Sequence, residues 1–396
     1  MKKWLIIFSI IFGIGFIAST AIAGRVYHKE LNNYTDHRKE RLDISALTNI
    51  YIDSEIPVQL ETTTEEPYVE FNQTFIDLLG MAPEFELTVK AKGSSTYIDL
   101  EQIKSNNIYL GVQKDEASLT VYLPQKAYDT IQVKNQNYMY TNQNSEYAVN
   151  LQDVDVEKIE LDLIYGEVRL NGNYDQISIN IDSGSLDLDS NKPAILEVTG
   201  RLNMNLEGQY QNISIAGVRG REVYVDSEVP THLKMESDGT YIKLRGKYES
   251  IHLEGYSNNI DAKSESICNI MVQQSNNTIN LNGAFKNIAL NGEDSLINIQ
   301  TTVIPQYIKL LGYITQPINL TLPSNMKGFE VRYVGENSQV VNELSEIMSD
   351  YEVVQGVSEK GEITYTYGDG SVPILLDYVS DCIIEIIDGG YSSELQ

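Results

Sequence analysis

Carboxylates near the middle of the chain are the residues whose types and spacing could do chemistry. Asp182, Asp187 and Asp189 lie close together, Asp162 comes one repeat earlier, and Arg169 lies between them. Carboxylates gathered on one face could hold Ca²⁺ or divide the acid and base roles of glycoside cleavage. The pattern supports a rival hypothesis of a carbohydrate-active lyase or hydrolase, although aspartates at strand ends are expected in any acidic protein.

Other residues that could act in catalysis are sparse. The chain has four histidines, of which His232 and His252 fall in adjacent repeats at different offsets. A metal pair from these two is less favoured than exposed side chains. No HExxH, GxSxG, P-loop or paired CxxC motif occurs. We therefore predict a protein that is not an enzyme, with no catalytic residue, no resident metal and no cofactor.

Tyrosine is the stronger functional signal, with 26 in the chain. Tyr174, Tyr210 and Tyr248 share one offset within their repeats. Exposed tyrosines at one offset would form a stripe suited to sugar or protein contact. We predict a recognition surface there, and tyrosines that only cover a β-surface are the alternative.

Paired asparagines recur one repeat apart. Asn258 and Asn259 follow Ser257, and Asn276 and Asn277 follow Ser275. Stacked asparagine side chains can form a hydrogen-bonded ladder. The spacing predicts such a ladder along a corner, with a structural role.

A pattern of about eighteen residues must position all of these side chains. An apolar residue opens each repeat, at Ile159, Ile177, Ile195, Ile213, Leu233, Ile251, Ile270, Ile288 and Ile308. All but one are followed by a second apolar residue two positions later. Ile195 departs, because Glu197 stands there with Val198 beside it. Spacing by two is strand periodicity, since alternate side chains share a face.

A second apolar pair and a small residue complete each repeat. The pairs run from Val168/Leu170 to Ile318/Leu320, and the small residues are Gly172, Ser190, Gly208, Ser227, Gly246, Ser264, Gly283 and Thr301. A large side chain at a stacked corner would collide with the neighbouring coil. We predict an all-β parallel solenoid with coils of about 18 residues over 136–325, and a sandwich of antiparallel hairpins is the alternative.

The flanking regions have weaker patterns. Residues 42–135 alternate irregularly and predict an N-terminal β region, and Tyr138–Tyr147 predicts an excursion from the stack. Residues 326–396 predict a small C-terminal cap. Within it, Ser338–Asp350 has helical spacing and Ile363–Tyr367 and Cys382–Ile387 are strand-like.

The N-terminus indicates location. Lys2 and Lys3 precede the uncharged segment Trp4–Ala23, which is long enough to cross a bilayer. Residues 1–24 therefore predict a retained single-span anchor, with a cleaved signal peptide as the alternative. Residues 25–41 predict a polar stalk that could rest on anionic headgroups. Either way the body is expected outside the cytoplasm.

Charge and cysteine content narrow the class further. The formal net charge is −27, which is the wrong sign for nucleic acid binding. Cys268 and Cys382 are too few for a disulfide framework, and they predict either one bridge or two buried thiols.

A resemblance adds to this interpretation. The segment Leu119–Asn135, LTVYLPQKAYDTIQVKN, followed by strands such as Tyr165–Gly172, YGEVRLNG, resembles the bacterial "putative adhesin" family. The shared pattern is Leu123-Pro124, then Tyr128-Asp129, then Ile131 and Val133, and the resemblance covers about residues 42–330. Members are described largely as a domain of unknown function, often on Gram-positive surfaces behind one membrane span.

The resemblance implies no catalytic residues, because the family supplies none that could be carried over. Some members are encoded beside envelope-stress signalling proteins. We therefore expect a non-enzymatic surface protein that binds or senses envelope polysaccharide or another surface protein. A structural partner of a membrane stress system is a further alternative.

Overall fold

The described part of the chain is built from β-strands, as the alternating pattern predicts. A computed structural model of the protein describes residues 33–76, 84–104, 116–135, 148–314, 316, 318–334, 353–357, 363–379 and 382–387. Apart from one short 3-10 turn, η1 (Ile44–Ala46), its regular elements are strands, so the all-β prediction is confirmed. Two compact units divide the chain: unit 1 holds residues 1–124 and 134–145, and unit 2 holds residues 125–133 and 146–396.

Unit 1 contains strands in both orientations. They are β1 (Asn33–Arg41), β2 (Asn49–Ser54), β3 (Val58–Thr63), β4 (Tyr68–Ile76), β5 (Glu84–Lys92), β6 (Ser95–Lys104) and β7 (Glu116–Pro124). β2 pairs with β6 and β3 with β7 in parallel, whereas β1–β4, β4–β7 and β5–β6 are antiparallel. The predicted alternation is confirmed by burial of Ile50, Ile52, Val58, Leu60, Val69, Phe71, Leu119 and Val121.

β1 occupies part of the segment that the sequence predicts as a stalk. Asn33–Arg41 pairs with β4 along its whole length, so the prediction is wrong for these residues. Their charges have partners on β4: the Lys39 ammonium lies 3.5 Å from the centroid of the Tyr68 ring, and His37 Nε2 lies 2.8 Å from Glu70 Oε1. A charged sequence therefore fits a paired strand as well as a free stalk.

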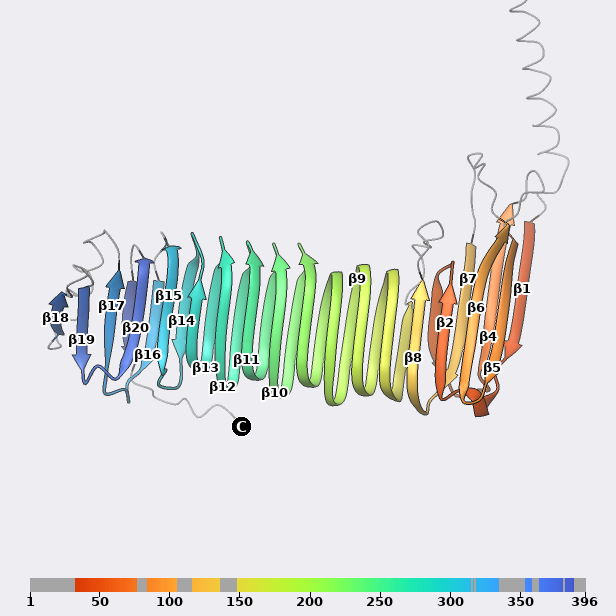
Figure 1. The fold of residues 1–396 in the computed structure, drawn as a ribbon, viewed down its shortest axis with the longest axis horizontal. Helices are drawn as coiled ribbons and strands as arrows, with labels where there is room; N and C mark the ends of the chain where they lie inside the picture. The colour runs from red at the N-terminus through yellow and green to blue at the C-terminus, as the bar shows by residue number, and fades with distance from the viewer. Residues whose placement is uncertain are drawn as a thin grey trace, which may run out of the picture. The chain divides into compact units, whose positions relative to one another are not determined.

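Unit 2 is a long series of strands. They are β8 (Ala127–Asn135, whose last two residues group with unit 1), β9 (Val149–Arg219), β10 (Glu222–Asp238), β11 (Tyr241–Tyr256), β12 (Asn259–Ser275), β13 (Thr278–Asn291), β14 (Leu296–Thr301), β15 (Tyr307–Ile314), β16 (Ile318–Pro323), β17 (Gly328–Val334), β18 (Val353–Val357), β19 (Ile363–Gly368), β20 (Val372–Val379) and β21 (Cys382–Ile387). Figure 1 shows β9 to β13 as successive turns of one winding ribbon. We call each turn a rung.

Neighbouring rungs pair in parallel and in register. Ile242 of β11 lies between Val223 of β10 and Ile260 of β12, and the row continues to Ile279 and Ile297. Like residues therefore stand beside like residues, about 4.8 Å apart. Both apolar pairs of the sequence pattern form continuous buried rows, from Ile159 to Leu310 and from Val168 to Leu320.

The exception at Ile195 has a structural explanation. The buried residues of that rung are Leu196 and Val198, one position later than the pattern places them, so the choice of Ile195 is wrong. The preceding corner begins at Ser190 and needs six residues to reach Leu196. A glycine corner such as that at Gly208 needs five to reach Ile213.

Glycine corners and serine corners alternate along the stack. A Cβ on Gly172, Gly208, Gly246 or Gly283 would stand 2.2–2.3 Å from a backbone oxygen of the preceding rung. The predicted collision is therefore present at these corners. At the intervening corners Ser190, Ser227, Ser264 and Thr301 donate a side-chain hydrogen bond to the carbonyl two residues later, which closes the bend.

An aromatic side chain follows each of these glycines by two residues and fills the corner. These residues are Tyr174, Tyr210, Tyr248 and Phe285, and all are 0% exposed. The Tyr248 hydroxyl donates to the Val225 carbonyl of the preceding rung at 2.9 Å. The Tyr210 hydroxyl donates toward the carbonyls of Leu188 at 3.0 Å and Glu207 at 2.8 Å. The Tyr210 and Tyr248 hydroxyls therefore join two rungs.

An asparagine ladder is present at another corner, formed by one residue of each predicted pair, Asn258 and Asn277, through side-chain to backbone hydrogen bonds. Asn258 and Asn277 are 2% and 4% exposed. The backbone N–H of Asn258 donates to Asn277 Oδ1 at 2.7 Å, and the N–H of Thr240 donates to Asn258 Oδ1 at 2.8 Å. Since each carboxamide accepts from a backbone N–H of the preceding rung, the ladder satisfies buried backbone donors.

The C-terminal strands extend the stack beyond its predicted end near residue 325. β20 pairs in parallel with β15, and β21 pairs in parallel with β16. β17 also pairs in parallel with β20, so a strand from late in the chain lies between β15 and β17. β18 and β19 complete this end with antiparallel pairs. The structure therefore differs from a separate cap over 326–396.

Several predictions fall on residues outside the described ranges. These are the anchor at 1–24, the Tyr138–Tyr147 excursion and the Ser338–Asp350 helix. Among the residues that are described, there is no helix of sufficient length and hydrophobicity to span a bilayer. Cys268 is a free buried thiol, so the bridge, one of the two predicted alternatives, is not formed, and burial raises the pKa of Cys268 to about 12.

Substituting Tyr210 by phenylalanine should separate the contribution of ring packing to stability from the contribution of the hydroxyl hydrogen bonds. Tyr210→Phe removes a buried donor to two carbonyls, so we expect the free energy of unfolding to fall by about 1–2 kcal/mol. In the described structure the Tyr174 hydroxyl is buried without a hydrogen-bond partner. Tyr174→Phe should therefore leave stability unchanged or raise it. Denaturant unfolding of both variants checks this, and equal losses would contradict it.

Glycine substitution tests the close approach at the corners. Gly246 has φ +91°, and its added Cβ would lie 2.2 Å from Ser227 O. Gly246→Ala should cost about 2–5 kcal/mol, from backbone strain and overpacking together. Gly239 also has positive φ, +59°, but its nearest neighbour would be 3.9 Å away. Gly239→Ala should therefore cost only about 1–2 kcal/mol in the same unfolding measurement.

Candidate functional site

The predicted tyrosine stripe is not a surface. Tyr174, Tyr210 and Tyr248 do share one position, but all three are fully buried in the glycine corners. Burial raises the pKa of each hydroxyl above its ordinary value. The prediction of a recognition surface made of these residues is therefore wrong, because each ring turns inward and fills its corner.

The predicted carboxylate group is brought together only in part. Asp187 accepts from Arg169 Nε at 3.2 Å through one oxygen and from Asn205 Nδ2 at 3.0 Å through the other. Asp189, two residues along the same strand segment, accepts from Asn171 at 3.3 Å. Asp162 lies in the other strand segment of its rung, where it accepts from Asn180 at 2.8 Å.

Within the described ranges, the structure brings together neither a metal site nor the two histidines His232 and His252. No group of three or more His, Cys, Asp and Glu side chains there could hold a metal ion. His252 stands opposite Lys234, whereas His232 stands opposite Ser250 and contacts its hydroxyl at 2.8 Å. The two histidines therefore do not face one another across the stack.

A hollow on the outward face of the second strand segments is the best candidate site. Its volume is about 510 Å³, within the range of small-molecule sites. It crosses four consecutive rungs, from β9 through β10 to β11. We call it the Tyr224 hollow; its lining side chains include Ser185, Asp187, Asn203, Asn205, Glu222, Tyr224, Tyr241 and Lys243.

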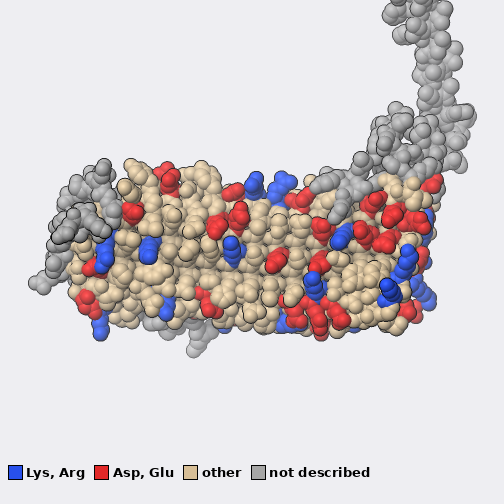
Figure 2. Space-filling model, in the orientation of Figure 1, with Lys and Arg blue, Asp and Glu red and all other residues tan. Residues whose placement is uncertain are grey.

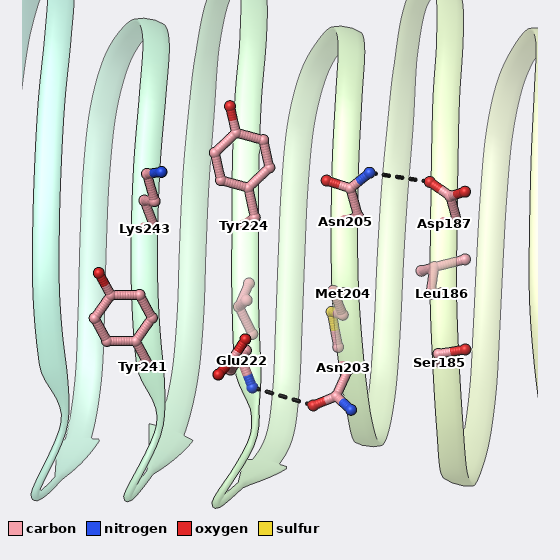
Figure 3. A pocket seen from close by; sticks show the side chains of 11 residues that line it. Ser185, Leu186, Asp187, Asn203, Met204, Asn205, Glu222, Tyr224, Tyr241 and Lys243 are labelled. Atoms are coloured by element: carbon pink, nitrogen blue, oxygen red, sulfur yellow. Dashed lines mark hydrogen bonds between the residues drawn. The ribbon is translucent and has the colours of Figure 1, made fainter.

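These side chains form two rows that run across the rungs. One row is Asp187, Asn205, Tyr224 and Lys243, and the other is Ser185, Asn203, Glu222 and Tyr241 (Figure 3). Between the rows lie the segments at Leu186, Met204 and Val223, whose side chains point into the core. The strand pleat alone directs the two rows outward, since alternate residues take opposite faces.

Several polar groups at the hollow have spare hydrogen-bonding capacity. Among the described residues, Glu222 and Lys243 form no ion pair with each other or with a neighbour. The Lys243 ammonium lies 5.3 Å from the centroid of the Tyr224 ring, a cation–π contact. Asn203 uses its carbonyl oxygen to accept from the Glu222 N–H at 3.2 Å, which leaves its amino group for another acceptor.

A row of carboxylates borders the hollow. Asp189, Glu207 and Asp226 stand two residues beyond Asp187, Asn205 and Tyr224 in their strands, and Glu207 is in register with Asp226. Burial, followed by the nearby carboxylate charges, raises the pKa of Asp189. On the face drawn in Figure 2, acidic and basic side chains are interspersed among a larger uncharged area.

Strand position could have identified the exposed tyrosines from sequence. Tyr224 lies between the inward residues Val223 and Val225, and Tyr241 directly precedes the inward Ile242. Both therefore face outward, and Tyr241 is 42% exposed. The shared offset of the corner tyrosines was a signal of packing instead.

Comparisons with known proteins give distant likenesses only. No protein-family model matches the chain, and no curated protein matches it in sequence. A "putative adhesin" from Parabacteroides distasonis is similar in structure with a TM-score of 0.36 and 9% identity, over 69% of this chain and 98% of that one. A "putative adhesin" from Parabacteroides merdae gives a TM-score of 0.33 and 10% identity over the same shares.

A third similar structure is a "putative cell adhesion protein" from Clostridium sporogenes. Its TM-score is 0.19 at 10% identity, over 89% of this chain and 100% of that one. At these TM-scores the likenesses carry no argument about ligand or activity. The chain is thus an all-β protein with distant structural neighbours that are named as adhesins.

The raised pKa of Asp189 predicts a pH-dependent effect on stability. Because its folded pKa lies above the usual 3.8, ionisation on going to neutral pH costs folding stability. Asp189→Asn keeps the acceptor for Asn171 and removes the charge. It should therefore raise the unfolding midpoint at pH 7, with a difference from wild type that shrinks as pH falls toward 3.8.

A matched substitution serves as the control for that measurement. Asp175 lies 2.7 Å from Lys192 in an ion pair, and its side chain is 53% exposed. Asp175→Asn should not raise the midpoint at pH 7. A stabilisation equal to that of Asp189→Asn would show that general charge reduction, and not the site of Asp189, is responsible.

Proposed function

We propose that this chain is a non-enzymatic binding protein of the cell exterior, of the adhesin or envelope-sensing kind. It uses the Tyr224 hollow to hold an envelope ligand. One observation carries the proposal: two outward tyrosines and several polar side chains with spare hydrogen-bonding capacity converge on one hollow of a β-face. Sites of this composition on rigid strands suit recognition.

The stacked rungs act in this proposal as a parallel β-solenoid. The unbroken parallel registers of β10 to β13 support it, as do the close approaches between successive corners. In such a stack each rung is held by its two neighbours, so no side chain of the hollow stands on a free loop. The solenoid is then a rigid support for an extended ligand.

The location at the cell surface is part of the proposal. Lys2, Lys3 and the apolar segment Trp4–Ala23 support a single-pass anchor in a Gram-positive membrane, with the body outside; secretion after cleavage is the alternative. A net charge of −27 suits a surface protein that must stay soluble.

A binding role is favoured over the carbohydrate-active enzyme. Both carboxylate oxygens of Asp187 already accept hydrogen bonds, from Arg169 and Asn205. The fixed Asp187 is better suited to orient Asn205 at the wall of the hollow.

The binding role predicts that the two outward tyrosines are needed for capture of envelope material. Tyr224→Ala and Tyr241→Ala should each weaken binding of the full chain to isolated cell-wall material by about tenfold. Tyr313, 64% exposed and outside the hollow, gives the control variant Tyr313→Ala, which should bind normally.

Two outcomes would count against the proposal. Protease treatment of intact cells should digest the body, and its protection would contradict an external location. Reducing-end and unsaturated-product assays on a polysaccharide panel with Ca²⁺ should show no turnover. Robust turnover that is abolished by Asp187→Ala would favour the enzyme instead.

A further inference from the structure

We propose that the ligand of the Tyr224 hollow is an uncharged polysaccharide that lies along the stack, across at least four rungs. This inference rests on the proposed binding function and names its ligand class. It depends on the shape of the hollow, the chemistry of its lining groups and the charge around it.

The shape favours a linear chain over a compact ligand. The lining side chains come from four consecutive rungs in register, and three rung spacings of about 4.8 Å give a site roughly 14 Å long. The two outward rows form its sides, and the strand segments between them form the floor (Figure 3). A compact metabolite would leave part of both rows without contact.

The lining groups match a polyhydroxylated ring. Tyr224 and Tyr241 come from adjacent rungs and from opposite rows, so that each row offers one aromatic face. The C–H face of a pyranose can pack on such a ring while its hydroxyls point sideways. The Asn203 amino group and Lys243 are donors, and Glu222 is an acceptor. Sugar hydroxyls can serve both kinds of partner.

The charges disfavour both kinds of ionic polymer. A uronate or phosphate polymer would meet Glu222, with the carboxylate row of Asp189, Glu207 and Asp226 beside the hollow. Since each charge repels the next along a regular polyanion, the cost grows with length. A polycation would be attracted by that carboxylate row, but inside the hollow it would meet the Lys243 ammonium, which has no ion pair in the described part and stands beside Tyr224. A neutral chain avoids both penalties.

Calorimetric titration of the full-length chain, held in a non-glycosidic detergent, tests this ligand class. The probes are three kinds of hexasaccharide: neutral (cellohexaose and chitin hexasaccharide), cationic (chitosan hexasaccharide) and anionic (hexagalacturonate). We expect at least one neutral probe to bind at least tenfold more tightly than either charged probe. We also expect less than a twofold change in its Kd between 50 and 500 mM salt, since no ion pair forms.

Variants tie that binding to the hollow. Tyr224→Ala and Tyr241→Ala should lower the affinity for the neutral probe at least tenfold, and Tyr313→Ala should not. Asp187→Asn with Glu222→Gln should raise the affinity for hexagalacturonate, because the Glu222 charge is removed and the Arg169 guanidinium loses its ion-pair partner. Tyrosine variants that bind as well as wild type would overturn the assignment of the site.

The outcomes separate the ligand class from the proposed function. Preference for a charged probe, or a Kd that rises steeply with salt, overturns the neutral class while leaving a binding protein. If the chain still binds cell-wall material from which all polysaccharide has been removed, the proposed ligand class is also overturned. If the chain binds none of the probes and also does not bind intact cell-wall material, the proposed function is overturned as well.

Discussion

The close approach of one rung to the next at each corner is the constraint on which unit 2 depends. At Gly246 an added Cβ would come within 2.2 Å of a carbonyl oxygen in the rung before it. Parallel strands in register leave no freedom to relieve that contact, because a shift at one corner would displace both neighbouring rows. The stack therefore alternates two solutions: glycine with a buried aromatic ring, and serine or threonine with a side-chain hydrogen bond to its own bend. The one-residue difference in corner length follows from this alternation.

The same strand registers also arrange the outward side chains in rows across the rungs. Carboxamides and carboxylates of adjacent rungs stand opposite one another, so that Asn298 contacts both Asn280 and Asn319 at hydrogen-bonding distance. Such ladders use up the hydrogen-bonding groups of the face. At Tyr224 and Lys243 larger side chains interrupt the ladder, and the groups beside them keep spare capacity. A candidate site therefore arises where the regular pattern of the stack breaks.

Much of the architecture could be predicted from the sequence, and the functional surface could not. The apolar pairs, the small corner residues and the asparagine ladder all follow from contacts that recur at fixed spacing. The tyrosines at one offset led to a wrong prediction of a recognition surface for the same reason, since regular spacing in a stack indicates packing contacts before binding. The charged β1 segment was misplaced as a stalk because its partners on β4 lie about thirty residues away in sequence. The hollow needs residues from four rungs, and no local window contains them.

The sequence by itself determined the inward face of most of the paired apolar residues, because strand alternation is local. It also determined where corners fall, since glycine and serine mark them. Only the tertiary structure decided that Tyr174, Tyr210 and Tyr248, each two residues after a corner glycine, turn inward and fill the corner. It also decided that β20 lies between β15 and β17, an order that requires strands distant in sequence to share a row.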